Sequence, residues 1–264
     1  MSEQVPPLQI SRDGTVAVLT LNRPKSGNAI DVQMAKALLA AAIECDCDST
    51  VRAVLINARG KQFSVGGDLN SFAVANDRTP QLISEETAYL HAAVARLARM
   101  DKPIVIAVQG AAAGAGFGLS ILGDIVIAGE AAQFTLAYTA IGLTPDGGAS
   151  WLLPRLVGLR KAQEMIFMNT RLNALEALDT GLVTRVVPDA ALDAEARATA
   201  HALAAGPTRA FSRSRDLLLA SFGETLETHL ERESRGIVRS VAGPDGKEGI
   251  SAFLSRRRPE FQGQ

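Results

Sequence analysis

The chain has 264 residues, of which 47% are hydrophobic, and a formal net charge of −1. This length suits one large domain with a small appendage, and the hydrophobic fraction is sufficient to fill a core. A nearly neutral chain lacks the basic surface that nucleic acid or an anionic membrane would attract. No apolar run approaches the roughly 18 residues of a membrane span, and the N-terminal residues lack a signal-peptide pattern. We therefore expect a cytoplasmic protein without a nucleic-acid or membrane partner.

The cysteines and histidines do not form a metal-binding pattern. Cys45 and Cys47 are the only cysteines, and they lie two residues apart on a predicted helix, where they point to different sides. His91, His201 and His229 are scattered through helical patterns without ligand spacing. We expect neither a disulfide nor a metal site.

Strands and helices alternate through the first hundred residues. Asp13 and Gly14 form a strong hairpin-turn pair between two segments with strand character. Asp68, at the end of a polar loop, is predicted to cap the helix that follows. The predicted elements are strands at residues 8–12, 16–21 and 53–58, helices at about residues 31–45 and 84–100, and polar connections at residues 22–29, 59–69 and 76–80. Because this order places several loops at one edge of a sheet, we expect a ligand site there.

The second half of the chain ends in helices. A turn around Pro145 and Gly147 precedes a predicted helix, and Gly206 with Pro207 marks the best candidate boundary. The predicted elements are helices at residues 149–156, 192–205, 208–221 and 226–241, a short helix after residue 170, and a strand at residues 183–187. We therefore divide the chain into a core at residues 1–206 and a helical region at residues 207–264.

Residues 103–128 form the stretch around which the rest is organised. Two continuous apolar runs, at residues 104–108 and 124–128, have the pattern of strands buried on both faces. Gly110, Gly114, Gly116 and Gly118 lie between them, where a turn becomes a short helix. A helix that opens here leaves backbone N–H groups free from about Ala115 onward, and these can hold a developing negative charge.

The glycines are compatible with two other interpretations. They are compatible with close packing of a helix on a strand and nothing more. They also have the look of the glycine-rich turn of short-chain dehydrogenases, but such a turn belongs after the first strand of its domain. This one lies in mid-chain, and Tyr138 is followed four residues later by Gly142 instead of the lysine of those enzymes. We reject a dinucleotide site.

Four motifs in order, over about residues 5–262, resemble the crotonase superfamily, the enoyl-CoA hydratases and isomerases. The motifs are Asn22-Arg23-Pro24 with Asn28-Ala29, Phe63-Ser64-Val65-Gly66-Gly67-Asp68-Leu69, Gly110-Ala111-Ala112-Ala113-Gly114-Ala115-Gly116 followed by Gly123-Asp124, and Ile141-Gly142-Leu143-Thr144-Pro145-Asp146-Gly147-Gly148. The resemblance implies an α/β fold, a crotonase (ClpP-like) spiral of ββα units with an α-helical C-terminal trimerisation region. It also implies a homotrimer or a dimer of trimers, an acyl-CoA thioester as substrate, and no cofactor besides the coenzyme A of that substrate.

The resemblance also assigns residues to the site. In the family, two backbone N–H groups hold the thioester oxygen, and by position these are the amides of Gly67 and Ala115. Removal of such a donor costs about 3 to 4 kcal/mol of transition-state stabilisation. The resemblance further implies substrate contacts from Arg23, Ala29, Gly66, Asp68, Tyr138 and Arg256, of which Arg256 would reach a phosphate of coenzyme A.

The departures from the family pattern point to a particular reaction. Hydratases of this family use two glutamates, and at those positions the chain has Gly118 and Tyr138. Asp146 remains as a carboxylate, and with the C-terminal segment at residues 248–254 it makes the chain most similar to the ring-epoxyphenylacetyl-CoA isomerases of phenylacetate breakdown. One base suffices for isomerisation, because it can remove a proton from one carbon and return it to another. Ile141, Leu143 and Trp151 are expected to desolvate it.

Three hypotheses follow. The first is an enoyl-CoA isomerase in which Asp146 shuttles the proton. The second is hydratase or other crotonase chemistry, including attack by Asp146 on an aromatic ring as in related 4-chlorobenzoyl-CoA dehalogenases. That reaction requires aromatic walls, for which Phe117, Tyr138 and Trp151 are the candidates. The third is a homologue that binds CoA esters without catalysis, in which Asp146 is only a turn residue.

Overall fold

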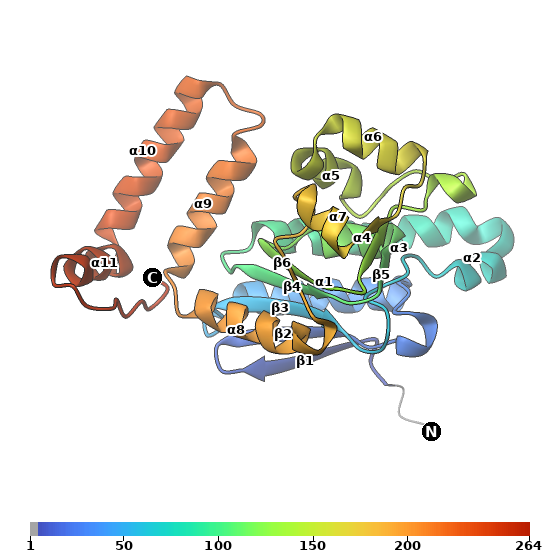
Figure 1. Ribbon diagram of the computed structural model, residues 1–264, viewed down its shortest axis with the longest axis horizontal. Coiled ribbons are helices and arrows are strands. Elements are labelled where there is room, and N and C mark those ends of the chain that lie inside the picture. The colour runs from blue at the N-terminus through green and yellow to red at the C-terminus, as the bar shows by residue number, and fades with distance from the viewer. Residues whose placement is uncertain (1–4) are drawn as a thin grey trace.

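Two β-sheets, one of six strands and one of three, form the frame of the protein (Figure 1). The computed structural model describes residues 5–264. Six strands form the larger sheet in the order β1-β2-β3-β4-β6-β9, and three short strands form the smaller one in the order β5-β7-β8. The strands are β1 Leu8–Asp13, β2 Val16–Leu21, β3 Ala53–Ala58, β4 Ile104–Val108, β5 Ala111–Ala113, β6 Ile125–Gly129, β7 Gln133–Thr135, β8 Leu172–Asn173 and β9 Arg185–Val187.

Helices cover both faces of the larger sheet and then leave it as an arm. The α-helices are α1 Val32–Cys47, α2 Leu69–Ala75, α3 Thr79–Arg99, α4 Gly114–Ser120, α5 Ala149–Val157, α6 Leu159–Phe167, α7 Ala174–Asp179, α8 Leu192–Ala204, α9 Thr208–Ala220, α10 Leu226–Ala242 and α11 Pro244–Leu254. Short 3₁₀ turns lie at Pro24–Ser26, Asn76–Arg78, Thr139–Ile141 and Asp189–Ala191. Figure 1 shows α9, α10 and α11 projecting from the sheet on one side. The division at residue 206 stays a prediction.

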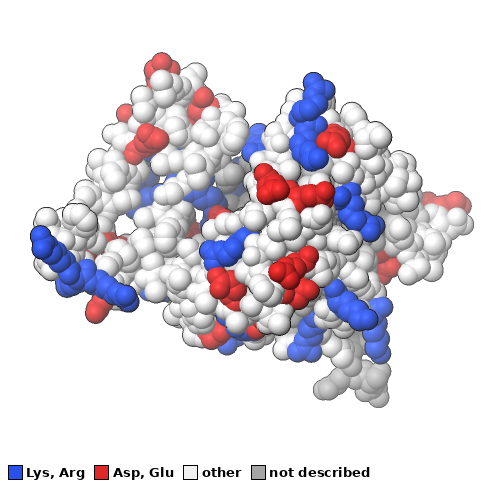
Figure 2. Space-filling view, viewed as in Figure 1, with Lys and Arg blue, Asp and Glu red and all other residues white. Residues whose placement is uncertain are grey.

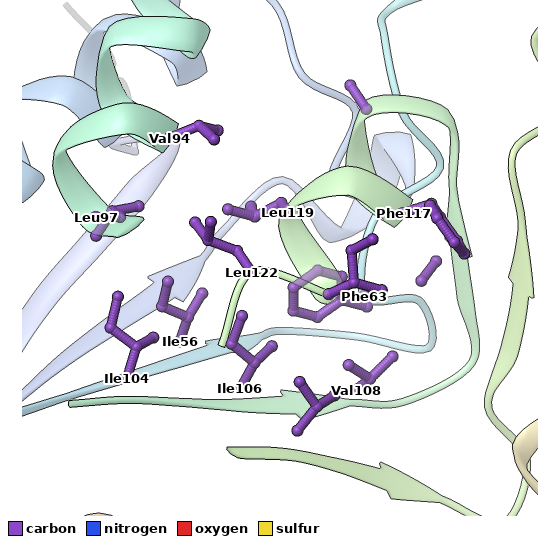
Figure 3. Packing of buried hydrophobic residues seen from close by; sticks show 14 of the residues in the cluster. Ile56, Phe63, Val94, Leu97, Ile104, Ile106, Val108, Phe117, Leu119 and Leu122 are labelled. Carbon is purple, nitrogen blue, oxygen red and sulfur yellow. The ribbon is translucent and has the colours of Figure 1, made fainter. Parts of the chain in front are cut away.

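Alternation along the strands builds two hydrophobic cores. On β3, Val54 and Ile56 face the larger core with α1 and α3, whereas Ala53 and Leu55 face the smaller core with α8. Both faces are therefore buried, which explains why the strands are apolar at every position. Figure 3 shows Ile106 of β4 in the larger core, close to Leu119 and Leu122, which anchor α4 to the sheet.

The N-terminal half follows the sequence closely. The β1–β2 hairpin pairs antiparallel around Asp13 and Gly14, and Gly14 has the positive φ of +59° that its turn requires. The side chain of Asp31 accepts a hydrogen bond from the N–H of Met34 (2.8 Å) and starts α1. Asp68 accepts from the N–H of Ser71 (3.3 Å), so its predicted capping of α2 is confirmed.

One predicted connection is wrong. Residues 76–80 were expected to form a polar loop before a helix beginning near residue 84, but α3 begins at Thr79. Pro80 lies in its first turn, where a missing N–H costs no intrahelical hydrogen bond. In the middle of a helix a proline interrupts the helix, but Pro80 lies at the start of α3 and is compatible with it. The three strands of the smaller sheet and helix α6 were also missed, because β5, β7 and β8 have only two or three residues each.

The surface carries both signs of charge. Figure 2 shows lysine and arginine side chains interspersed with aspartate and glutamate over the visible face, as the net charge of −1 leads one to expect. Among the helices of residues 5–264, none is both long enough and apolar enough to cross a membrane.

Candidate active site

Two stretches of backbone meet where the smaller sheet leads into α4. Ser64 forms a parallel bridge with Ala112 of β5, and the next residues run beside the start of α4. Gly66 has a φ of +94°, and a Cβ atom on it would lie 2.8 Å from the carbonyl oxygen of Ala113 and 3.3 Å from the nitrogen of Ala115. Only a residue without a side chain permits this approach. Gly66 thus sets the spacing between the two stretches.

The amides of Gly67 and Ala115 have no hydrogen-bond partner within residues 5–264. Ile30 bonds to both neighbours of Gly67, donating to the oxygen of Gly66 (2.7 Å) and accepting from the N–H of Asp68 (2.8 Å). Ala115 is the second residue of α4, whose first N–H groups have no intrahelical acceptor. Both residues line one cavity, so the structure brings the two predicted amides to the same space.

This cavity has a volume of about 460 Å³ and a mostly apolar wall. Its lining consists of Val65, Gly67, Leu69, Phe72, Ile83, Glu86, Thr87, Gly114, Ala115, Leu136, Ala137, Tyr138, Ala140, Ile141, Leu143, Thr144 and Asp146. Its size is that of a small-molecule site. Three acidic or phenolic groups face it, contributed by Glu86, Tyr138 and Asp146.

Asp146 and Tyr138 are joined by a hydrogen bond. The phenol of Tyr138 donates to Oδ1 of the half-buried Asp146. Burial raises the pKa of the Tyr138 phenol, and the negative charge of Asp146 raises it further, so the phenol stays protonated and remains a donor. Ile141 and Leu143 line the cavity as expected, although both are substantially exposed. Trp151 does not line it; it belongs to a separate hollow, where the Arg155 guanidinium stacks on its ring at 3.9 Å.

Glu86 is the site residue that sequence reasoning missed. It lies on α3, is 4% exposed, and its Oε2 has no hydrogen-bond partner among the described residues. Burial raises its pKa to about 8, and the charges of Asp146, Asp31 and Asp68 act in the same direction. A signal was present in the sequence. Glu86 shares a helical face with buried apolar residues four, seven, eight and eleven positions further on, namely Leu90, Ala93, Val94 and Leu97.

Gly118 explains why a hydratase carboxylate is absent. A Cβ atom on Gly118 would lie 2.9 Å from the carbonyl oxygen of Gly147 and 3.5 Å from the Cβ atom of Ala149. The turn that carries Asp146 therefore occupies the space that a side chain at residue 118 would need. His91 helps to fix this turn, since its Nε2 accepts a hydrogen bond from the N–H of Gly147 (3.2 Å).

Of the six predicted substrate contacts only Tyr138 lines the cavity; the other five, namely Arg23, Ala29, Gly66, Asp68 and Arg256, are not part of its lining. The Arg23 guanidinium donates to the carbonyl oxygen of Ala29 (2.7 Å) and forms ion pairs with Asp31 (3.0 Å) and Asp68 (3.1 Å). These contacts tie together the loops at the start of α1 and α2. Arg256 is exposed directly after α11, in the arm. Substrate contacts by these five residues stay predictions.

The fold and the cavity define a spiral α/β protein whose site combines two free backbone amides with acidic side chains. Residues 11–264 match the family model described as Enoyl-CoA hydratase/isomerase. The chain therefore belongs to the enoyl-CoA hydratase/isomerase family, and the predicted crotonase fold is confirmed.

Individual relatives carry several different reaction names. A 1,2-epoxyphenylacetyl-CoA isomerase of Escherichia coli strain K12 is 36% identical over 250 residues, which cover 94% of this chain and 95% of that protein. A 4-chlorobenzoyl coenzyme A dehalogenase-2 of an Arthrobacter species is 31% identical over 94% of this chain and 91% of its own length. A solved enoyl-CoA hydratase structure from Polaromonas sp. JS666 has a TM-score of 0.92 and 31% identity, and the match covers 97% of this chain and 99% of that one.

Proposed function

We propose that this protein is an acyl-CoA isomerase, which moves a double bond or rearranges a ring epoxide in the acyl group of a coenzyme A thioester. One observation carries the proposal: Asp146 lines the same cavity as the unpartnered amides of Gly67 and Ala115. The relatedness to a 1,2-epoxyphenylacetyl-CoA isomerase supports the choice of an isomerase over other reactions of the family.

The chemistry follows from these groups. A proton on the carbon next to a thioester is far less acidic than a carboxylic acid, so Asp146 can remove it only if the enolate is stabilised. The amides of Gly67 and Ala115 would donate to the thioester oxygen as its negative charge develops. Return of a proton to a carbon two bonds away then completes the shift of the double bond. Tyr138 would hold the Asp146 carboxylate in place by its hydrogen bond.

The cavity walls argue against the two other reactions. Hydration by the two-glutamate mechanism would need a carboxylate at residue 118, where the backbone of Gly147 leaves no room. Nucleophilic attack on an aromatic ring would need aromatic walls, but of the three expected residues only Tyr138 lines the cavity. Phe117 is fully buried in the larger core (Figure 3), and Trp151 lines another hollow.

We also propose that the protein assembles as a trimer or a dimer of trimers through its arm. Helix α10 has no buried residue, and Leu226, Leu230, Ile237, Val238 and Val241 are all exposed on it. An apolar stripe of this length is typical of a helix that packs against another chain. Sedimentation of the full chain tests this assembly.

The function is tested with 3-hexenoyl-CoA, whose conversion to the conjugated 2-enoyl thioester is followed by absorbance and NMR. Asp146→Asn keeps the shape of the side chain and an acceptor for Tyr138 but removes the base. We expect kcat to fall by at least about 10³-fold, which is within the range for loss of a residue that acts as general base and then as general acid. The Kd for hexanoyl-CoA should change little.

The exposed Asp179 on α7 provides the control. Asp179→Asn should retain wild-type turnover. Turnover by Asp146→Asn at the wild-type rate would refute the proposed function, as would a wild-type protein that binds acyl-CoA without isomerising it.

A further inference from the structure

Glu86 is a buried acid that the mechanism has not yet used. It is 4% exposed on α3 and faces the cavity that Asp146 and the free amides also line. Its Oε1 lies 3.8 Å from the position that a Cβ atom on Gly67 would occupy, which places the carboxyl beside one of the two amides. No described residue donates a hydrogen bond to its Oε2. A buried polar atom without a partner is costly and calls for an explanation.

The surroundings of Glu86 keep it protonated. The charged groups that face it are Asp31 at the start of α1, Asp68 at the start of α2, and Asp146 before α5. All three are carboxylates, and Arg23 pairs with the first two instead of with Glu86. With burial, these charges raise the pKa of Glu86 to about 8.

Within residues 5–264, no cation is among the charges that act on Glu86. The Tyr138 phenol, which lines the same cavity, is neutral and donates to Asp146. On α3 itself, Glu85 points outward and pairs with Lys36 (2.7 Å), and His91 bonds to the N–H of Gly147. A carboxylic acid on a residue that lines the cavity, with its Oε1 beside Gly67, is suited to donate its proton into the cavity.

We propose that Glu86 is a second catalytic residue, which delivers a proton to the far carbon of the enolate after Asp146 has removed one from the near carbon. This inference rests on the proposed isomerase function. The C2–H bond breaks, its proton goes to the Asp146 carboxylate, and the electron pair moves into the enolate that the amides of Gly67 and Ala115 hold.

The second half of the step balances the first. The C4–H bond forms with the proton of Glu86, which becomes a carboxylate, and the double bond is left between C2 and C3. Asp146 then releases its proton to solvent water and Glu86 takes up a proton from solvent, which restores both residues. No oxidant or further reactant is required, and the two acids divide the tasks of base and acid.

The test uses Glu86→Gln, which is nearly isosteric but cannot give up a proton, and Glu86→Asp, which keeps a carboxyl group. Glu85→Gln, one residue earlier on the exposed side of α3, is the matched control. Each variant is assayed with 3-hexenoyl-CoA across pH 6 to 9, and with the same substrate deuterated at C2 in ordinary water.

We expect kcat of Glu86→Gln to fall by about 10²-fold, that of Glu86→Asp to recover part of the loss, and that of Glu85→Gln to match the wild type. Wild-type kcat/KM should decline above about pH 8, where Glu86 loses its proton, and Glu86→Gln should lack this decline. The wild-type product should carry hydrogen from solvent at C4. In Glu86→Gln some deuterium should appear at C4, because Asp146 alone carries the proton.

The outcomes separate this inference from the proposed function. If Asp146→Asn is inactive while Glu86→Gln keeps the wild-type rate and pH profile, Glu86 is only a buried structural acid and the relay is wrong. If the wild-type product already carries the C2 deuterium at C4 as fully as the variant product does, the relay is equally overturned. A wild-type protein that does not isomerise 3-hexenoyl-CoA would overturn the function and the relay together.

Discussion

The cavity has two walls of different construction. The backbone wall, residues 64–67 and 112–118, presents main-chain amides and is held by a parallel bridge and by glycines in close contact. The side-chain wall, Glu86, Tyr138 and Asp146, presents ionisable groups from three separate segments. The positions of the amides on the backbone wall depend on glycines that have no side chain. The reactions available at the side-chain wall depend on which ionisable side chains are present. The same backbone wall can therefore serve several reactions, while the side-chain wall selects one.

Gly66→Ala should break the backbone wall, with an effect on kcat second only to that of Asp146→Asn. The new Cβ atom would lie 2.8 Å from the oxygen of Ala113, at a φ of +94° that alanine rarely adopts, so the stretch carrying Gly67 must move away from Ala115. We expect kcat for 3-hexenoyl-CoA to fall by about 10²- to 10³-fold, as for loss of one donor to the oxyanion.

Gly223→Ala is the control for this substitution. Gly223 has no heavy atom within 4 Å of its would-be Cβ and no positive φ. Its variant should retain wild-type activity. If Gly66→Ala also retained wild-type activity, the spacing of the two amides would not control catalysis. The proposed role of the backbone wall would then be wrong.

Glu86→Gln should show how much the buried Glu86 carboxyl lowers the free energy of unfolding. Unfolded Glu86 has its ordinary pKa near 4.5, and the folded value of about 8 means that the native state holds a proton that the unfolded chain releases. The free energy of unfolding is therefore unaffected by this group below about pH 4.5 and falls as pH rises toward 8. At pH 7 the loss of stability amounts to about 3 kcal/mol. Glutamine does not titrate, so the variant should gain stability over the wild type as pH increases.

Urea unfolding of the full chain at fixed concentration, at pH 4.5, 6 and 7.5, measures this difference. The gap between Glu86→Gln and the wild type should widen with pH, and Glu85→Gln should show no such widening. A gap that is the same at all three pH values would mean that Glu86 is ionised in the folded protein.

Tyr138→Phe should give the smallest effect. It removes one hydrogen bond to the Asp146 carboxylate and leaves the ring in place. A hydrogen bond to a charged group contributes about 1.5 to 3 kcal/mol, of which only part bears on the transition state, so we expect kcat to fall by about 10-fold.

Ultraviolet titration provides a second reading of this bond. The chain has two tyrosines, so the difference between wild type and Tyr138→Phe reports the Tyr138 phenol. Its absorbance change should come well above the ordinary pKa of about 10, because burial and Asp146 oppose its ionisation. Ionisation near pH 10 would show that the phenol is open to solvent and does not bond to the carboxylate.

The two walls also differ in how far the sequence predicts them. The strands and the Ala115 amide of the backbone wall follow from local signals, because apolar runs fix the strands and the glycines from Gly114 onward mark the start of α4. The Gly67 amide was assigned only through the family resemblance. The proline and glycine neighbours of Asp146 predict the turn that carries it, but its assignment as the base came from the family resemblance.

Glu86 could not be assigned in this way. Its role depends on a contact between α3 and residues sixty positions further along the chain, and helical periodicity indicates only that its face is buried. The error at the start of α3 has a related cause, since Pro80 is compatible with a loop or a first helical turn until the preceding turn is known. Trp151 was misplaced because adjacency in sequence does not fix which side of α5 it faces.

The contact between Gly118 and the 146–148 turn limits how this protein can change its reaction. A glutamate introduced at residue 118 would collide with main-chain atoms, which cannot rotate aside as a side chain can. Acquiring water-adding chemistry would first require that the loop bearing Asp146 be rebuilt, and that rebuilding would displace the proposed base. Under single substitutions the two activities exclude one another, so intermediates between them would be expected to be poor at both.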